Sequence, residues 1–387
     1  MRARRLITVG HSYVIGVNRR LSHELERVGG DAWEVTCIAP RKYRADLGWA
    51  RFEPTNDDGS RTSAVAAYGT RSPHLFAYGL ELRSILRSSW DVVYAWEEPY
   101  VVSCWQIARW APADAAFTFL TLQNIRKRYP PPFSLFERQA LERSGGWLYC
   151  GHSIHAAQKD KPGYAERPSH YGPLGVDVEL FRPEPSAKRS AREELGWSND
   201  GPPVVGFVGR FVPEKGLAVL MQALDGVSSP WRALFLGGGP LEPAIRAWAA
   251  RYGDRVRIAT APHDRVPAFV NAMDLLCAPS ESARHWKEQF GRMIVEAFAC
   301  GVPVIGSDSG EIPFVVGEGG VIAPEQQVAA WTRAIGELVD DAPRRRELGI
   351  RALERARSVF SWPVVARQYL DFFEQLLDAR APRGRIS

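Results

Sequence analysis

Short apolar stretches alternate with longer amphipathic stretches along the whole chain. In the first half, residues 16–29 place Leu21, Leu25 and Val28 on one face of a predicted helix that closes on a Gly-Gly pair. Strands that alternate with such helices are typical of βαβ units on a parallel sheet. The apolar runs of this half predict strands at residues 6–10, 33–39, 91–95, 116–122 and 147–151.

The second half repeats the alternation after a stretch of proline, charge and glycine at residues 181–203, which predicts a linker. Predicted strands lie at residues 204–209, 233–236, 256–259, 275–278 and 302–306, and predicted helices at residues 216–224, 241–252, 266–273, 292–300 and 328–339. The 387 residues exceed the length at which a single core stops growing. We therefore expect two doubly wound α/β domains that face a cleft, at residues 1–182 and 203–362.

Two segments do not fit the simple alternation. Residues 41–70 are polar and contain Gly and Asp, so we expect a long loop or an excursion from the alternation there. The last periodic segment, residues 364–379, is long enough to cross back onto the first domain, to which we assign residues 363–387.

Composition excludes several classes of protein. The chain is 45% hydrophobic and 24% charged, and it has neither an apolar run of about 18 residues nor an apolar signal region after its basic start. We therefore expect a cytoplasmic protein. Its five cysteines lie far apart in apolar runs, so we expect them to be reduced and buried.

The net charge of +5 lies entirely in the first half. Residues 1–182 carry 24 Lys and Arg against 19 Asp and Glu, which leaves 49 − 24 = 25 against 44 − 19 = 25 for the rest. Such a basic half is either a solvated surface or an attraction for an anionic acceptor, a membrane surface or nucleic acid. The run at residues 124–133 mixes Arg and Lys with aromatic residues, which suits contact either with lipid headgroups at the inner face of a membrane or with the acceptor. The other basic residues are scattered without a nucleic-acid motif, which argues against nucleic acid.

Loops that contain charged residues or glycines suited to ligand binding follow three predicted strands of the second half. Arg210 and Lys215 flank a proline turn just before a predicted helix, and two cations beside a helix start suit a diphosphate. The next loop contains Gly238 and Gly239, which let a backbone approach a ligand closely. On its own, each of these features is also common on protein surfaces and in tight turns.

The third loop runs through "EQFGRMIVEAFACGVPVIGSDSGEIP", residues 288–313. Glu288 precedes the predicted helix and Glu296 lies one to two turns inside it, with the free N–H groups near Phe290 and Gly291 between them. A carboxylate accepts two hydroxyl hydrogen bonds at once, so the pair suits the sugar and the ribose of a nucleoside diphosphate sugar. Two glutamates at this spacing are otherwise ordinary surface residues of a helix.

Three segments resemble glycosyltransferase family 4, whose members are retaining enzymes of the GT-B fold: "GVDVELFRP", "VGRFVPEKG" and the segment around residues 279–320. The resemblance spans about residues 170–322 and is weaker, though collinear, before them. It implies a hexosyltransferase (EC 2.4) that uses a nucleoside diphosphate sugar and needs no metal or other cofactor. The resemblance assigns the diphosphate to Arg210 and Lys215, the donor sugar to Glu288, the ribose to Glu296, and backbone contacts to Gln289, Phe290 and Gly291.

The first domain departs from the family pattern of a Gly-Gly pair and a mid-domain histidine. The places of these residues are held by His11, Ser12, Gln123 and Asn124. We expect His11, beside a predicted strand end, to act at the site. Glu97 and Glu98 stand at another strand end, where a carboxylate can orient or deprotonate an acceptor hydroxyl, although a surface role is as common.

No carboxylate is convincing as the nucleophile of a two-step retaining route, and no plausible loop holds an Asp-X-Asp pair for a metal. We therefore expect attack on an oxocarbenium-like state from the face of the departing diphosphate, which takes the acceptor's proton. The expected donor is UDP- or GDP-linked, and the acceptor is a glycan, a lipid-linked or a small molecule in polysaccharide or glycoconjugate biosynthesis. The alternatives are an epimerase or phosphorylase of the same fold, a non-catalytic nucleotide-sugar-binding protein, and a nucleic-acid-binding protein.

Overall fold

The structure, a computed structural model, describes residues 2–45, 48–59 and 61–380. The chain divides into two compact units, Met1–Pro173 with Trp362–Ser387, and Leu174–Ser361. The division falls before the expected linker, and the whole of residues 181–203 belongs to the second unit.

The first unit is built on a seven-stranded parallel sheet in the order β11-β10-β9-β8-β1-β2-β5. Five of these strands match the predicted ones to within two residues at each end, because their apolar runs are buried on both faces. The strands are β1 (Arg4–Gly10), β2 (Trp33–Pro40), β5 (Thr62–Val65), β8 (Val92–Trp96), β9 (Ala116–Thr121), β10 (Gly146–Tyr149) and β11 (Ser169–Tyr171).

The expectation of a long loop at residues 41–70 is wrong. The strands β3 (Lys42–Ala45) and β4 (Gly48–Arg51) form an antiparallel pair, β5 joins the sheet beside β2, and β6 (Ala67–Tyr68) pairs with β7 (Ala77–Tyr78). These strands are two to four residues long and mostly half-exposed, so they lack the apolar runs that identify buried strands.

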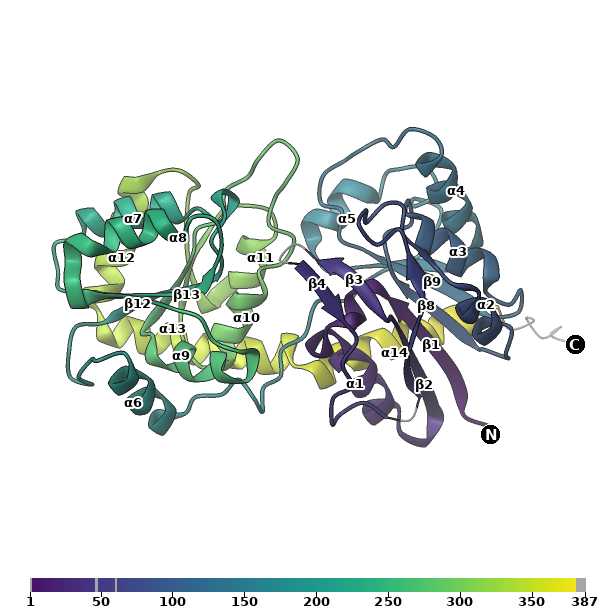
Figure 1. Ribbon diagram of the computed structural model, residues 1–387, viewed down its shortest axis with the longest axis horizontal. Coiled ribbons are helices and arrows are strands. Elements are labelled where there is room, and N and C mark those ends of the chain that lie inside the picture. The colour runs from purple at the N-terminus through teal and green to yellow at the C-terminus, as the bar shows by residue number, and fades with distance from the viewer. Residues whose placement is uncertain (1, 46–47, 60, 381–387) are drawn as a thin grey trace, which may run out of the picture. The chain divides into compact units, whose positions relative to one another are not determined.

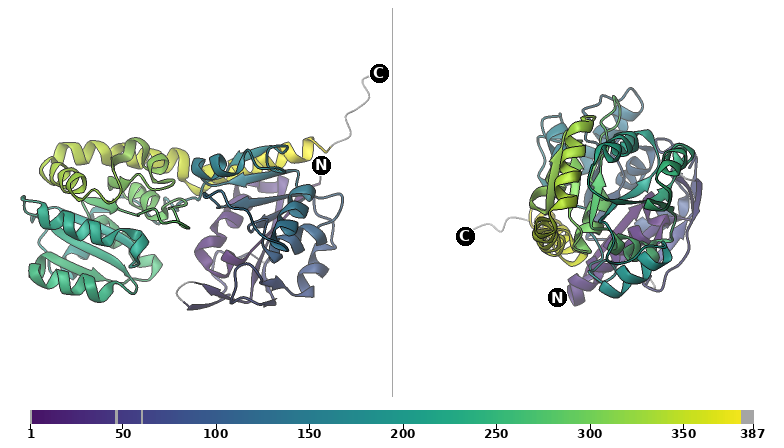
Figure 2. Two further views of the ribbon diagram at one scale, coloured as in Figure 1. Left: turned by 90° about the horizontal axis from the view of Figure 1, so that it is seen from above. Right: turned by 90° about the vertical axis from the view of Figure 1, so that its left-hand side faces the viewer.

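The C-terminal helix belongs to the first unit, as expected. In α14 (Trp362–Asp378), the rings of Tyr369 and Phe373 pack against Tyr94 of β8 at 5.7 and 5.6 Å, and α14 lies beside α1 (Arg20–Gly29) (Figures 1 and 2). The unit's other helices are α2 (Leu80–Leu86), α3 (Val102–Trp110), α4 (Phe133–Arg143), α5 (His152–Gln158) and the 3-10 turns η1 (His11–Val14), η2 (Gly16–Arg19) and η3 (Gly30–Ala32).

The second unit is built on a six-stranded parallel sheet in the order β14-β13-β12-β15-β16-β17. The helices α7, α8 and α12 lie on one face of this sheet, and α9, α10 and α13 lie on the other (Figure 1). Its strands are β12 (Val204–Arg210), β13 (Arg232–Gly238), β14 (Val256–Ala259), β15 (Leu275–Ala278), β16 (Val304–Ser307) and β17 (Gly320–Ala323). Its helices are α6 (Pro185–Glu194), α7 (Leu217–Gly226), α8 (Glu242–Ala249), α9 (Val266–Ala272), α10 (Arg292–Ala299), α11 (Ile312–Val316), α12 (Val328–Asp340) and α13 (Ala342–Arg355), with the short turns η4 (Pro213–Lys215), η5 (Ala250–Arg255), η6 (His263–Arg265), η7 (Gly317–Gly319) and η8 (Ala356–Phe360).

The predicted linker is wrong in part, because it contains α6. Glu184 caps this helix by accepting from the Ser186 N–H, and Pro185 occupies its first turn. The buried Arg192 guanidinium donates to the Ala272 carbonyl at 3.0 Å and to Asp274 at 2.6 Å, so α6 is fixed to the body of the second unit.

The five cysteines are buried and none forms a disulfide, as expected. Within the described residues, no helix combines the length and the apolar composition that a membrane-crossing segment needs.

Candidate functional site

The strand order of the second sheet places its topological switch point at β12. The chain leaves β12 toward β13 on one side and later returns to β15 on the other, so the connections diverge at the carboxyl ends of β12 and β15. Ligands of open α/β sheets bind at such a point. Arg210 ends β12, Lys215 ends the turn η4 that follows, and Ser280 stands two residues beyond β15.

The structure brings Lys215 and Glu288 together at this edge. The Lys215 ammonium forms an ion pair with the Glu288 carboxylate, and the Ser280 hydroxyl donates to the same carboxylate oxygen at 2.9 Å. Glu288 is 7% exposed, and these partners offset the cost of burying its carboxylate. The Lys215 ammonium also lies 5.2 Å from the centre of the Trp286 ring. A lysine held in this way is an oriented positive charge at the switch point.

Serine hydroxyls join the strand ends that carry this pair. The Ser307 hydroxyl at the end of β16 donates to the Ser280 carbonyl at 2.6 Å. The Glu311 N–H donates to the Glu288 carbonyl at 3.0 Å, which ties the Glu288 loop to the start of α11. Neither Ser280 nor Ser307 was among the predicted site residues. Each lies at the end of an apolar run in the sequence.

Gly216 allows the turn after β12 to reach β15. Its backbone is left-handed, with φ of 66°, and a Cβ atom there would lie 1.8 Å from the Pro279 carbonyl oxygen. Any larger residue would therefore separate the Lys215 turn from the Ser280 loop.

Gly238 and Gly239 serve different purposes. A Cβ atom on Gly239 would lie 2.7 Å from the Phe211 carbonyl oxygen, so this glycine allows two segments of protein backbone to approach each other. A Cβ atom on Gly238 would have no heavy atom within 4 Å among the described residues compared. Only Gly238 therefore leaves open space beside its backbone, as a ligand contact requires.

Alanine substitutions should distinguish Gly216, which allows close backbone packing, from Gly238, which has open space beside it. We expect Gly216→Ala to lower the free energy of unfolding by at least about 2 kcal/mol, because it adds both left-handed strain and a backbone clash. Gly238→Ala is the matched control and should change it by less than about 0.5 kcal/mol. Urea denaturation measures both, and equal losses in the two variants would contradict the packing described above.

Glu288 lies in the loop and Glu296 in the second turn of α10, the positions expected from the sequence. Glu296 is 8% exposed, and burial raises the pKa of its carboxyl to about 7, although the positive charge of Arg292 one turn earlier opposes the shift. A buried carboxylate whose negative charge has so little compensation lowers the stability of the free protein. Such a residue is typical of a ligand-binding site.

The segment before α10 contains the predicted positions Gln289, Phe290 and Gly291. The buried Phe290 ring packs edge-on against Phe360, with 5.7 Å between ring centres, so it anchors the loop. Gly291 precedes the first turn of α10 with φ of 85°, and the Gln289 side chain is exposed.

The residues predicted for the first unit follow three adjacent strands. β1, β8 and β9 are neighbours in the sheet, and the segments beyond their carboxyl ends start at His11, Glu97 and Leu122. The sheet order therefore brings the predicted positions to one edge.

His11 and Glu97 form a dyad at this edge. The His11 Nδ1 lies 2.7 Å from one Glu97 oxygen, and the His11 backbone N–H donates to the other at 2.7 Å. The Tyr78 hydroxyl donates to that second oxygen at 3.0 Å. Burial lowers the pKa of His11, but the charge of Glu97 and its hydrogen bond outweigh burial and raise the pKa above its usual value. Glu97 is 2% exposed, so in this structure it orients His11 and is not turned to a ligand.

The pairing of His11 with Glu97 leads to a prediction about the pKa of His11. In Glu97→Gln, burial of His11 remains while the raising charge is lost, so the pKa of His11 should fall below that of the parent protein. Proton NMR of the histidine rings between pH 5 and 9 measures it, and His11→Asn identifies the resonance. An unchanged His11 pKa in Glu97→Gln would show that the dyad is not formed in solution.

The remaining predicted residues of the first unit hold loops together. The Glu98 carboxylate accepts from the Thr121 hydroxyl at 2.8 Å and the Leu122 N–H at 2.7 Å, while burial raises its pKa to about 7. The Gln123 side chain donates to the Tyr129 hydroxyl at 2.8 Å, and Asn124 follows it in the same loop.

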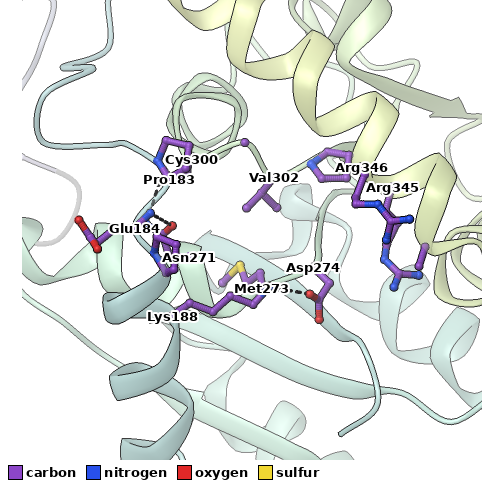
Figure 3. A pocket seen from close by; sticks show the side chains of 14 residues that line it. Pro183, Glu184, Lys188, Asn271, Met273, Asp274, Cys300, Val302, Arg345 and Arg346 are labelled. Atoms are coloured by element: carbon purple, nitrogen blue, oxygen red, sulfur yellow. Dashed lines mark hydrogen bonds and ion pairs between the residues drawn. The ribbon is translucent and has the colours of Figure 1, made fainter. Parts of the chain in front are cut away.

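A pocket of about 350 Å³ lies at the opposite, amino end of the second sheet (Figure 3). Asp274, which precedes β15, lies on its wall and pairs with Lys188 of α6 at 2.8 Å. Cys300, at the end of α10, accepts from Asn271 at 3.5 Å. The pocket contains none of the residues predicted from the sequence.

Comparisons with known proteins show what the second unit is similar to. Residues 202–341 match the family described as "Glycosyl transferases group 1". The D-inositol 3-phosphate glycosyltransferase of Xylanimonas cellulosilytica is 32% identical over 227 residues, which cover 55% of this chain and 53% of that protein. The GDP-mannose-dependent alpha-(1-6)-phosphatidylinositol monomannoside mannosyltransferase of Mycolicibacterium smegmatis is 32% identical over 200 residues, covering 49% and 52%. The chain thus spans about half the length of these relatives.

Solved structures extend the likeness to the whole chain. The Anabaena protein HepE in complex with UDP superposes with a TM-score of 0.70 over 96% of this chain and 100% of that one. The sequences are 18% identical, so this likeness concerns the fold, two parallel-sheet α/β units.

Proposed function

We propose that the chain belongs to glycosyltransferase family 4 and transfers a sugar from a nucleoside diphosphate sugar to an acceptor hydroxyl. The family match of residues 202–341, the relatives and the GT-B-like fold of two parallel-sheet α/β units support this proposal. One observation carries this proposal: Lys215 and Glu288 meet at the switch point of the second sheet, beside the end of β12. A cation for the diphosphate and a carboxylate for the sugar hydroxyls are the groups that such a donor needs.

In the proposed mechanism, Arg210 and Lys215 bind the diphosphate and stabilise the negative charge that develops as it leaves. Glu288 accepts hydrogen bonds from the donor sugar, and Glu296 accepts them from the ribose hydroxyls. The acceptor attacks from the face of the leaving group, and a phosphate oxygen takes its proton, so the anomeric configuration is retained. We propose that His11, which Glu97 orients, takes part in the reaction.

We propose a UDP- or GDP-linked donor. The relatives and neighbours support both, since one relative is named for GDP-mannose and HepE was solved with UDP. The acceptor belongs to a glycan, a lipid or a small molecule. Arg126 and Arg128, which are exposed, support peripheral contact with an anionic membrane surface, which liposome flotation tests.

Thermal-shift titration with UDP, GDP, ADP, CDP and dTDP tests donor binding. At 100 times its dissociation constant, the preferred nucleotide should stabilise the folded protein by about 2.7 kcal/mol. Product analysis then separates transfer from epimerase or phosphorylase activity, because only transfer releases the nucleoside diphosphate together with a glycosylated acceptor.

Transfer should not require a metal. The proposed mechanism uses Arg210 and Lys215 as the counter-charges of the diphosphate. We expect the rate in EDTA to stay within about twofold of the untreated rate. A rate that vanishes in EDTA and returns with manganese would exclude this mechanism.

A further inference from the structure

A pocket of about 490 Å³ opens in the first unit beside the carboxyl end of β1. Its walls come from η1, β3 and the loop after β6. Polar residues on these walls include His11, Ser12, Arg44 and Arg71. Arg44 and Arg71 were not among the residues that the sequence suggested for function.

The two arginines bring uncompensated positive charge to this pocket. Neither Arg44 nor Arg71 forms an ion pair with a carboxylate in the part of the chain that the structure describes. Other arginines of the same unit do: Arg19 pairs with Asp58 at 2.7 Å and Arg41 with Glu81 at 2.9 Å. Arg44 and Arg71 are exposed and line this concave surface, so part of the basic excess of the first unit lies there.

Ser12 provides an independent observation. Its hydroxyl oxygen is buried and has no hydrogen-bond partner among the described residues. A buried hydroxyl without a partner costs stability unless a ligand supplies one. The Asn18 side chain donates to the Ser12 carbonyl at 2.9 Å, which fixes the turn that carries this hydroxyl.

The wall of the pocket is held in place by a buried ion pair. Arg19 is fully buried, and its guanidinium donates to the Tyr13 carbonyl at 2.8 Å, the Glu53 carbonyl at 2.7 Å and the Asp58 carboxylate. These bonds join η1 to the segment before β5. The His11 ring packs against Tyr43 of β3, with 4.7 Å between ring centres. The pocket is thus preorganised, so little ordering energy is lost when a ligand binds.

We propose that this pocket binds an anionic group of the acceptor, a phosphate monoester or a carboxylate, through Arg44, Arg71 and the Ser12 hydroxyl. The guanidinium fork matches the paired oxygens of either anion, and the Ser12 hydroxyl supplies a further donor. The assignment to an acceptor rests on the proposed transferase function, whereas the anion site itself does not. The proposal narrows the acceptor from any compound with a hydroxyl group to one that also carries an acidic group.

Isothermal titration of the full chain tests the proposal with two pairs of probes. The anionic probes are sn-glycerol 3-phosphate and D-glucuronate, and their neutral counterparts are glycerol and glucose. The preferred nucleoside diphosphate is kept at saturation, so that the anions do not occupy the Lys215 site. We expect at least one anion to bind tenfold or more tightly than its counterpart.

Variants assign this preference to the pocket. Arg44→Gln with Arg71→Gln should reduce the preference to less than twofold, whereas the matched double change Arg83→Gln with Arg87→Gln, on exposed arginines outside the pocket, should retain it. Ser12→Ala should weaken the anion several-fold without lowering Tm, because the hydroxyl has no partner to lose. Sedimentation with phosphatidate and phosphatidylcholine vesicles separates a lipid-borne phosphate, which pellets the parent and not the double variant, from a soluble one.

The proposal is overturned if neither the anions nor phosphatidate vesicles bind better than their neutral counterparts, or if the Arg44 and Arg71 double variant keeps the preference. The nucleotide shift is recorded on the same samples. Its absence would refute the donor site and leave the anion result to stand by itself.

Discussion

Replacing Lys215 with methionine is expected to lower kcat by a factor of about 10² to 10³. The ammonium beside Glu288 is the oriented charge that we propose stabilises the departing diphosphate. The loss should appear mainly in kcat, because the charge that it stabilises is greatest in the transition state. Steady-state kinetics with the preferred donor measures this effect.

The matched control is Lys188→Met. Lys188 also pairs with a carboxylate, Asp274 at 2.8 Å, but it lies at the amino end of the same unit's sheet. Its loss should leave kcat within about twofold of the parent. Because Lys215→Met leaves the buried Glu288 carboxylate with a weaker partner, Tm is measured for both variants. An equal loss of kcat in both, or a loss below tenfold for Lys215→Met, would contradict the role of Lys215.

Replacing Glu296 with glutamine should change binding and stability in opposite directions. The variant should bind the preferred nucleoside diphosphate about 100-fold more weakly, because a neutral amide replaces two charge-assisted hydrogen bonds to the ribose. The free protein should become more stable above pH 7, by up to about 3 kcal/mol, because burial raises the pKa of Glu296 from 4.5 to about 7. Titration calorimetry and urea denaturation measure the two effects.

The stability gain has a defined pH dependence. Between pH 4.5 and 7, native Glu296 retains a proton that the unfolded chain has lost, so the parent protein loses stability as the pH rises through this range. The difference between variant and parent should be near zero below pH 4.5 and largest above pH 7. Glu337→Gln, at an exposed position of α12, is the control and should change neither quantity. A Glu296→Gln protein that is less stable at pH 8 than the parent would refute the assignment.

Much of the second unit could be predicted from the sequence, because most of its parallel strands are short runs of mainly apolar residues. Lys215 and Glu288 are 73 residues apart, yet both follow such runs, and neighbouring parallel strands bring their carboxyl ends together. The periodicity of α10 likewise placed Glu296 inside a helix. The ion pair between Lys215 and Glu288 could not be predicted, because it depends on the strand order.

Less of the first unit could be predicted, for physical reasons. Its edge strands β3, β5 and β6 are short and half-exposed, so they show no apolar period. The pairing of His11 with Glu97 joins residues 86 apart through the neighbouring strands β1 and β8. Arg44 and Arg71 have no local pattern that distinguishes them from other surface arginines. Only their place in the lining of the same pocket as Ser12 does so.

The central claim is that the carboxyl edge of the second sheet binds the donor. A crystal structure with the preferred nucleoside diphosphate tests it most directly. We predict diphosphate oxygens within about 3 Å of the Lys215 ammonium and the Arg210 guanidinium, and ribose hydroxyls on Glu296. A nucleotide bound elsewhere, for example in the pocket beside Lys188 and Asp274 at the other end of that sheet, would contradict the claim.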